Sequence, residues 1–378
     1  MHTPWIGPRK IVVIPAIVND PQYNSPPSNW VSQIQQRLFF DPDPNTGADR
    51  SLRSYMHTIS YGKALLEADV VNPVTVQPCD INATIEACPT SHLYEYACLV
   101  FMGGTHGCGG WAFWHTLFPY NPPRSPNNMR NWCRVNMGES LGIWAMEVMH
   151  MTTSFGDLYN TNPHPGNFDN MACSCGTHPS TYTKLKLGWL DPIYVPTVSY
   201  GSTTNFTLHA LALLQPPPPG RVTAVRIPSK ISQHYYLVEA RLRTDQYERA
   251  TPGISSGIPS EGVVVYEINE AAWPVRLRTP TALTVGQMYS NPAEQLDIEV
   301  IAAVPGGFTV SIKYPENPKC ASLRESITQA EDEIDYLQEE LRSAAPGAKA
   351  RIAARIKRLQ AQIRSARQEA INLGCRLK

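Results

Sequence analysis

Two side chains on one predicted helix carry the clearest chemical signal in this sequence. Glu147 and His150 stand three residues apart in the run WAMEVMHMTTS, so a helix brings both to one face. A glutamate three residues before a histidine is the second half of H-E-x-x-H, in which two histidines bind zinc and the glutamate acts as general base. The first histidine of that pattern is replaced here by Met146. A methionine thioether is a soft ligand that suits copper(I) better than zinc.

Strands and helices alternate on either side of this motif. Short apolar or period-two runs predict strands at residues 10–18, 61–71 and 96–104, and amphipathic spacing predicts helices at residues 28–40, 51–60 and 139–153. Ser28 is the expected N-cap of the first helix. Alternating strands and helices are typical of an α/β unit, which we place at residues 1–192.

The rest of the chain has two different patterns. Period-two segments between Pro/Gly turns predict antiparallel strands at residues 235–242, 262–269, 296–304 and 307–314. They indicate a β-rich, sandwich-like unit over residues 193–316. Residues 317–378 have helical spacing and form a third unit. The whole chain is therefore expected to be an α+β protein in three parts.

The third unit is expected to be an antiparallel helical hairpin. Apolar residues repeat with 4-3 spacing in residues 323–341 and 352–373, and Pro346-Gly347 interrupts the repeat. The first segment is rich in acids and the second in bases, which favours a hairpin over an extended dimeric coiled coil. Its two ends would bring Cys320 and Cys375 together, so these cysteines are a predicted disulfide. Self-association through this tail is a further hypothesis.

The composition excludes some classes of partner. Thirty-two Lys and Arg balance thirty-two Asp and Glu, so the net charge favours neither nucleic acid nor a membrane surface. We expect no membrane span, and no secretory signal peptide is recognisable at the N-terminus. Nine cysteines without a C-x-x-C pair argue against a cysteine zinc knuckle. The glycosylation sequons at Asn82 and Asn205 fit a secreted, disulfide-containing chain.

Several motifs, in order, resemble those of one enzyme family. SYGKALLEADVV, GCGGWAFW, GDLYN and FDNMACSCGTHPSTYTKLKLGWLDP precede residue 193, and YYLVEARL and GVVVYEIN follow it. On these motifs, residues 10–314 resemble the immune inhibitor A-like zinc metallopeptidases, which are related to gametolysin. The resemblance implies a zincin-like fold for the first unit, an extracellular location and hydrolysis of peptide bonds. The helical tail has no counterpart in this likeness.

The resemblance also implies roles for particular residues. Glu147 would be the general base, His150 a zinc ligand, Asp157 the third ligand and Met171 the methionine of the Met-turn. Two differences affect the implied zinc site. Met146 replaces the first histidine, and the interval from His150 to Asp157 is one residue longer than the family pattern. Zinc is therefore expected only with an incomplete or non-standard ligand set.

Other side chains offer alternative ligands. Four histidines lie in predicted loops from which one could complete a zinc site: His106, His115, His164 and His178. Oxygen ligands on the loop after the helix could instead hold calcium: Asp157, Asn160, Asn162 and Asp169. The glycine-rich run GGTHGCGG lacks the Lys-Ser/Thr of a phosphate-binding loop, and GESLG lacks the serine-nucleophile elbow.

Three functions are consistent with these observations. In the first, the chain is a pseudopeptidase, a protease-like protein with a degraded zinc site that acts by structure or by binding a protein or peptide. In the second, it is an active zinc metalloendopeptidase that uses Glu147 and a non-standard ligand set. In the third, it is a structural or assembly protein whose helical tail mediates contacts. Loss of the first metal ligand is hard to compensate, which favours the first function.

Overall fold

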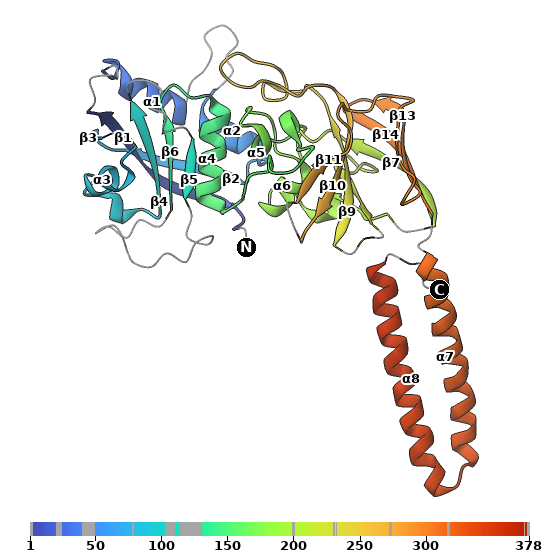
Figure 1. The fold of residues 1–378 in the computed structure, drawn as a ribbon. Coiled ribbons are helices and arrows are strands. Elements are labelled where there is room, and N and C mark those ends of the chain that lie inside the picture. Colours follow the sequence, from blue (N-terminus) through green and yellow to red (C-terminus); the bar gives the residue numbers. More distant parts are fainter. Residues whose placement is uncertain are drawn as a thin grey trace.

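The structure, a computed structural model, describes residues 3–19, 25–39, 50–77, 79–102, 110–113, 131–198, 201–229, 231, 233–271, 274–315, 318–373 and 375. A mixed sheet with helices, two antiparallel sheets and a pair of long helices follow one another, and the helix pair projects away from the rest (Figure 1). This is the expected mixed α+β organisation with a C-terminal helix pair.

The first part is built on one mixed sheet. Its strands are β1 (Gly7–Val18), β2 (Ala64–Val70), β3 (Val74–Val76), β4 (Tyr96–Met102), β5 (Trp111–Phe113) and β6 (Asn131–Asn136). The order is β2-β1-β4-β6-β5, and β3 pairs with the end of β1. The described pairs are parallel except β5 with β6, which is antiparallel. β2 and β5 therefore lie at opposite edges of the sheet.

β1 is buried on both faces because helices cover both sides of the sheet. Ile11 and Val13 pack in one apolar core with residues of α1 (Trp30–Leu38), α2 (Leu52–Ile59) and α4 (Leu141–Thr153). Val12 and Ile14 point the other way, into a smaller core with Ile85 of α3 (Ile81–Glu86). A strand between two layers reads as a continuous apolar run. This burial explains the strand predicted at residues 10–18, which the structure confirms.

The first helix begins later than predicted, and the assignment of Ser28 as its N-cap is wrong. α1 starts at Trp30, and Asn29 stands at the N-cap without a side-chain hydrogen bond to the helix. The N–H of Trp30 donates to the carbonyl of Pro27 at 3.0 Å. Ser28 therefore lies within a turn that begins at Pro27, because a proline carbonyl can accept while its fixed φ favours the turn.

Two antiparallel sheets form the β-rich part. One has the order β11-β10-β9-β8 and consists of β8 (Ala224–Pro228), β9 (His234–Arg241), β10 (Gly262–Asn269) and β11 (Val275–Leu277). The other has the order β12-β13-β14-β7 and consists of β7 (Ser202–His209), β12 (Met288–Asn291), β13 (Leu296–Val304) and β14 (Gly307–Tyr314). Side chains of both sheets meet in one apolar cluster.

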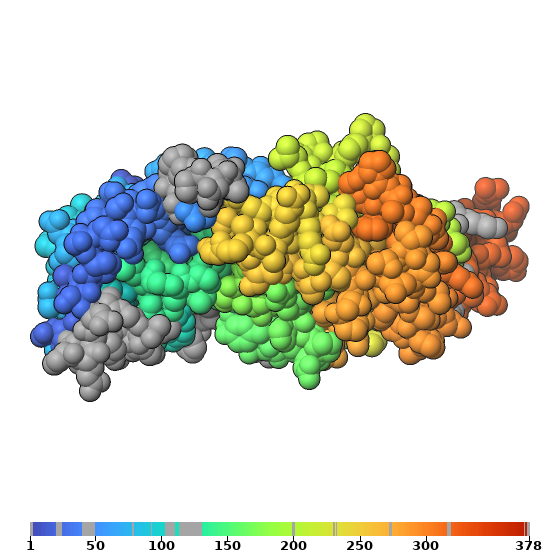
Figure 2. Space-filling model, turned by 90° about the horizontal axis from the view of Figure 1, so that it is seen from above, coloured from blue at the N-terminus to red at the C-terminus, as the bar shows by residue number. Residues whose placement is uncertain are grey.

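The sheet that contains β9 and β10 is buried on both faces. Val263 and Val265 enter the cluster between the two antiparallel sheets, whereas Val264 and Tyr266 join the large core of the first part. Seen from above, the yellow residues near position 250 lie directly against blue and green residues of the first part (Figure 2). One core thus crosses residue 192, and the division into residues 1–192, 193–316 and 317–378 stays a prediction.

Short helical segments join these layers: η1 (Ser91–Leu93), η2 (Gly166–Phe168), α5 (Asn170–Cys173), α6 (Thr181–Lys186) and η3 (Pro192–Tyr194). A disulfide joins Cys173 to Cys175 at the end of α5. The two sequons are accessible, since Asn82 is exposed on α3 and Asn205 is exposed on the edge strand β7. Glycosylation at either asparagine stays a prediction.

The C-terminal hairpin consists of α7 (Pro318–Ser343) and α8 (Pro346–Asn372). Its seam contains an apolar cluster of its own: Ile327, Ala330, Ile334, Leu359 and Ile363. Two ion pairs cross between the helices, Arg355 with Glu333 at 2.7 Å and Arg367 with Glu331 at 2.6 Å. A disulfide joins Cys320 to Cys375 at the open end. Among the described residues, no helix is both long and apolar enough to cross a bilayer.

Candidate functional site

α4, the helix of Glu147 and His150, lies in the core of the first part with almost every residue buried. Ser140 caps its N-terminus, because its Oγ accepts the N–H of Ile143 at 3.3 Å. Gly142 allows the helix to touch the chain after α5. A Cβ on Gly142 would lie only 2.1 Å from the carbonyl oxygen of Ser174. The position of α4 therefore requires glycine at this contact.

Glu147 is a buried carboxyl group with an unsatisfied oxygen. The residue is 6% exposed, and its Oε2 has no hydrogen-bond partner among the described residues. Burial raises the pKa of Glu147 to about 7. A Cβ on Gly110 would lie 2.8 Å from Oε1, so the carboxyl group lies against the backbone that leads into β5. Near neutral pH it is partly protonated and can donate as well as accept a hydrogen bond.

His150 and Asp157 bind each other. Nε2 of His150 lies 2.8 Å from Oδ1 of Asp157, and Nδ1 contacts the carbonyl oxygen of Phe155. Burial alone lowers the pKa of His150, but the hydrogen bond and charge of Asp157 outweigh it, so the pKa is raised. Burial likewise opposes ionisation of Asp157, yet the bond to His150 holds the pKa of Asp157 below its ordinary value. Both ring nitrogens face acceptors, which is the environment of an imidazolium ion.

The sulfur of Met146 has a polar partner of its own. Ser174 Oγ donates to Met146 Sδ at 2.8 Å, and Ser174 has a left-handed backbone with φ 54°. Met171 is fully buried in the same apolar core as Met146. The structure thus brings both methionines to the core beside α5, and the Met-turn role of Met171 stays a prediction.

Two of the four predicted replacement histidines, His164 and His178, lie within the described residues, and each has a partner other than His150. His164 is exposed, and its Nδ1 accepts the N–H of Gly166 at 3.1 Å. His178 is fully buried and pairs with Asp245 at 2.7 Å, within an ionic network described below. His106 and His115 lie outside the described residues.

Asp169, one of the four predicted calcium ligands, has a structural role. It is fully buried, and its Oδ1 accepts the N–H of Met171 at 2.9 Å. Its Oδ2 accepts the N–H of Ser180 at 2.9 Å and the hydroxyl of Thr183 at 2.7 Å. The carboxylate therefore ties α5 to α6. Calcium binding stays a prediction that rests on the other three oxygen ligands, Asp157, Asn160 and Asn162.

The donor set around α4 fits a zinc ion poorly. Zinc sites in proteins provide three or four nitrogen, oxygen or sulfur ligands. Here His150 and Asp157 satisfy each other, and Met146 offers a thioether that already accepts a hydrogen bond. In the part of the chain that the structure describes, no three His, Cys, Asp or Glu side chains form a group that could hold a metal ion. Zinc binding stays a prediction for metal analysis.

A buried ionic network lies between α6 and β9. The sequence patterns did not predict it. Arg241 is fully buried and pairs with Glu239 at 3.0 Å and Glu248 at 2.6 Å. Lys184, also fully buried, donates to Nδ1 of His178 at 3.1 Å. One signal was present in YYLVEARL, where two charged residues occupy alternate positions on one face of the strand. Charges at such positions must be paired when that face is covered.

Comparisons with known proteins leave the family open. A scan against protein-family models finds no match to this chain, and a search of curated proteins finds no match either. The likeness to immune inhibitor A-like peptidases therefore rests on the order of the motifs, and its consequences are proposals.

Proposed function

We propose that this chain is a metallopeptidase-like protein with a degraded zinc site, and that it acts by binding a peptide rather than by hydrolysing one. The observation that carries the proposal is the contact of 2.8 Å between His150 and Asp157. Zinc ligands must be deprotonated and directed at the metal, whereas these two side chains neutralise each other. Met146 supplies only a soft thioether at the remaining position.

The surroundings of Glu147 support peptide binding. α4 packs against β5 and β6, and β5 is an edge strand whose partner among the described residues is β6. A peptide can add to such an edge as a further strand. Trp111 of β5 is 53% exposed and offers apolar surface to it. Glu147, partly protonated near neutral pH, can donate a hydrogen bond to a carbonyl of the bound peptide.

Metal content tests the proposal. The wild-type protein and Met146→His are stripped with chelator, exposed to zinc, dialysed and analysed by elemental mass spectrometry. We expect little zinc on the wild type and about one zinc ion per chain on Met146→His, because the substitution restores a set of three hard or borderline donors. About one zinc ion on the wild type would overturn the proposal. Zinc on neither protein would show that the site itself is misassigned.

Met149→His is the matched control for this measurement. Met149 lies on the same helix and is as buried as Met146, but it is adjacent to His150 in the chain and so projects from a different face of α4. The control is expected to bind no zinc. Zinc on both variants would indicate capture by an added histidine alone, without the predicted site.

A second candidate function is an active metalloendopeptidase with non-standard ligands. The contact of His150 Nδ1 with the Phe155 carbonyl favours it, because a histidine that binds a metal through one nitrogen commonly donates the other to a backbone carbonyl. A fluorogenic peptide assay, with and without added zinc, separates the two functions. An active peptidase should cleave the peptide, and Glu147→Gln should abolish that cleavage. If the chain is a pseudopeptidase, we expect no cleavage that depends on Glu147.

A further inference from the structure

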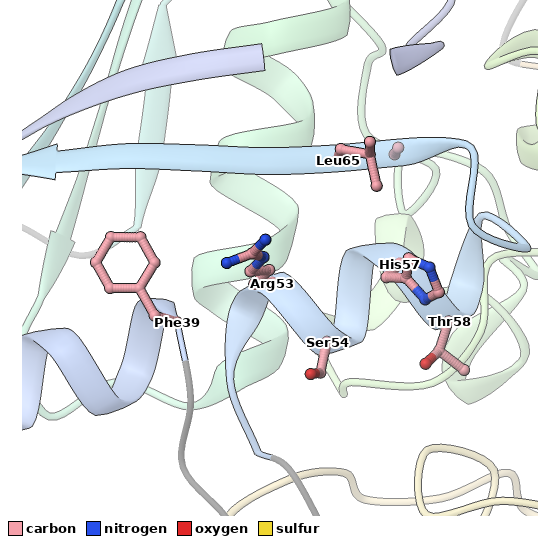
Figure 3. Close-up of a pocket in the computed structure, with 7 residues that line it drawn as sticks. Phe39, Arg53, Ser54, His57, Thr58 and Leu65 are labelled. Atoms are coloured by element: carbon pink, nitrogen blue, oxygen red, sulfur yellow. The ribbon is translucent and has the colours of Figure 1, made fainter. Parts of the chain in front are cut away.

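A second candidate site lies at the opposite edge of the mixed sheet from Glu147. A pocket of about 410 Å³ opens between the end of α1, the outer face of α2 and the start of β2 (Figure 3). Its main lining residues are Phe39, Arg53, Ser54, His57, Thr58 and Leu65. Pockets of this volume accept a small ligand or one to two residues of a peptide.

Two basic side chains converge on this pocket. Arg53 and His57 are four residues apart on α2, so they lie one turn apart on one face of the helix, and Figure 3 shows both on the side nearer β2. Within the described residues, neither side chain has a hydrogen bond or ion pair with another residue. A guanidinium group forms two parallel hydrogen bonds with a carboxylate. The pair is therefore available to an anionic group.

The turn after α2 positions the ring of His57. Gly62 has φ +79°, and a Cβ there would lie 3.3 Å from Nε2 of His57. Tyr61 also has a left-handed backbone with φ 57°, and its hydroxyl donates to the carbonyl of Leu211 at 2.6 Å. The run SYGK thus forms an anchored turn, and glycine leaves the room that the imidazole occupies.

Apolar surface lies beside the basic pair. Leu65 is 41% exposed although it belongs to a strand, and Phe39 lines the pocket from the C-terminal end of α1. β2 is an edge strand that pairs with β1 on one side. A peptide can lie along such an edge and place one side chain in an adjoining pocket.

We propose that this pocket binds the C-terminal carboxylate of a peptide that ends in an apolar residue. Arg53 and His57 bind the carboxylate, the terminal side chain packs between Phe39 and Leu65, and the peptide backbone pairs with the outer edge of β2. The charges favour an anionic ligand, because the lining residues that the structure describes include two basic groups and two hydroxyl groups but no acid. The inference does not rest on the proposed function, since β2 and β5 lie at opposite sheet edges.

Fluorescence polarisation with two matched probes tests this inference. The probes are fluorescein-labelled Thr-Thr-Gln-Thr-Leu with a free C-terminal carboxylate and the same peptide as a C-terminal amide. We expect the full chain to bind the acid about tenfold more tightly than the amide, because the amide loses charge-assisted hydrogen bonds. Arg53→Gln should remove most of this preference, and Leu65→Glu should weaken binding of the acid by placing a like charge in the pocket.

Two control variants make the assignment specific. Arg342→Gln changes an exposed arginine on α7, far along the chain from the pocket, and should leave the preference intact. Arg351→Gln on α8, also at an exposed position, should bind the acid as the wild type does. Loss of binding in Glu147→Gln would place the probe at the first site and would overturn the inference.

Other outcomes also decide the matter. Equal binding of acid and amide, binding of neither probe, or a preference that survives Arg53→Gln overturns the inference.

Discussion

Nε2 of His150 lies 2.8 Å from Oδ1 of Asp157, while Nδ1 contacts the carbonyl oxygen of Phe155. A carbonyl oxygen and an ionised carboxylate can only accept, so both ring nitrogens carry a proton in this arrangement. The imidazolium balances the charge of Asp157 inside the protein. A metal ion would have to displace that proton and break the ion pair before it could bind.

Asp157→Asn should weaken the fold most between about pH 4 and 7. The pKa of His150 is raised above its ordinary value of 6.5 in the folded chain. Its contribution to the free energy of unfolding is therefore complete below pH 6.5 and is lost as pH rises through the raised pKa. The pKa of Asp157 is lowered below 3.8, so its contribution is lost as pH falls through the lowered value. We expect a cost of about 1–2 kcal/mol at about pH 6.

Urea denaturation near pH 6 and pH 9 measures this effect. The cost of Asp157→Asn should be smaller at the higher pH, where His150 is losing its charge. Asp335→Asn, on an exposed part of α7, should cost little at either pH. A cost for Asp157→Asn that is the same at both values would contradict the ion pair.

Glu147→Gln should change how stability depends on pH. The pKa of Glu147 is raised from 4.5 to about 7 in the folded chain. As pH rises, Glu147 therefore ionises at a lower pH in the unfolded chain than in the folded chain. The free energy of unfolding is then expected to fall as pH rises through this interval. The variant has no such proton and should be more stable than the wild type at about pH 8, by up to about 3 kcal/mol.

Denaturation curves of both proteins over this range check the expectation for Glu147. Glu340→Gln on the exposed surface of α7 serves as control and should follow the wild type. If Glu147→Gln also follows the wild type at every pH, the carboxyl group is solvated and is not a buried donor for a peptide.

Lys184→Met should change how the free energy of unfolding depends on pH above neutrality. Burial, and next the charge of Arg241, lower the pKa of Lys184 from 10.5 to about 7. The unfolded chain therefore binds the proton more tightly, and the wild type should gain stability as pH rises from 7 towards 10.5. The variant should lack this gain.

The measured quantity for Lys184 is the difference in unfolding free energy between variant and wild type across that interval. Lys186→Met is the control, since Lys186 stands on the same helix but its side chain is 33% exposed and pairs with Glu270. A difference that does not change with pH would mean that Lys184 keeps its proton in the folded chain.

The hairpin of α7 and α8 should be removable without unfolding the sheets. Among the described residues, its apolar cluster shares no member with the cores of the rest of the chain. A chain that ends at Tyr314 should therefore unfold thermally within about 3 °C of the full chain, as measured by circular dichroism of the β-rich part. A larger loss would show that the sheets depend on the hairpin.

Light scattering of the same two chains tests assembly through the tail. If the hairpin mediates self-association, the full chain should form a dimer or higher species and the truncated chain a monomer. The acidic surface of α7 and the basic surface of α8 would make such contacts sensitive to salt. If the full and truncated chains have the same oligomeric state, the hairpin does not mediate self-association.

The helices and strands follow local patterns and were largely predictable. The strands predicted at residues 296–304 and 307–314 are β13 and β14, and the helix predicted at residues 139–153 contains α4. Period-two and helical spacing involve residues that are close together in the chain, so they can be recognised in a single sequence. The N-cap prediction at Ser28 was wrong because the nearby turn at Pro27 outweighed the preference of serine for that position.

By itself, the sequence determined which segments become helices and strands, and that Glu147 and His150 share a helix face. Only the tertiary structure decided that Asp157 pairs with His150, and that Glu147 keeps a buried oxygen without a partner among the described residues. It also joined His178 to Asp245, 67 residues away in the chain. Charge states and pairings depend on burial and on contacts between distant segments, and residue spacing carries neither.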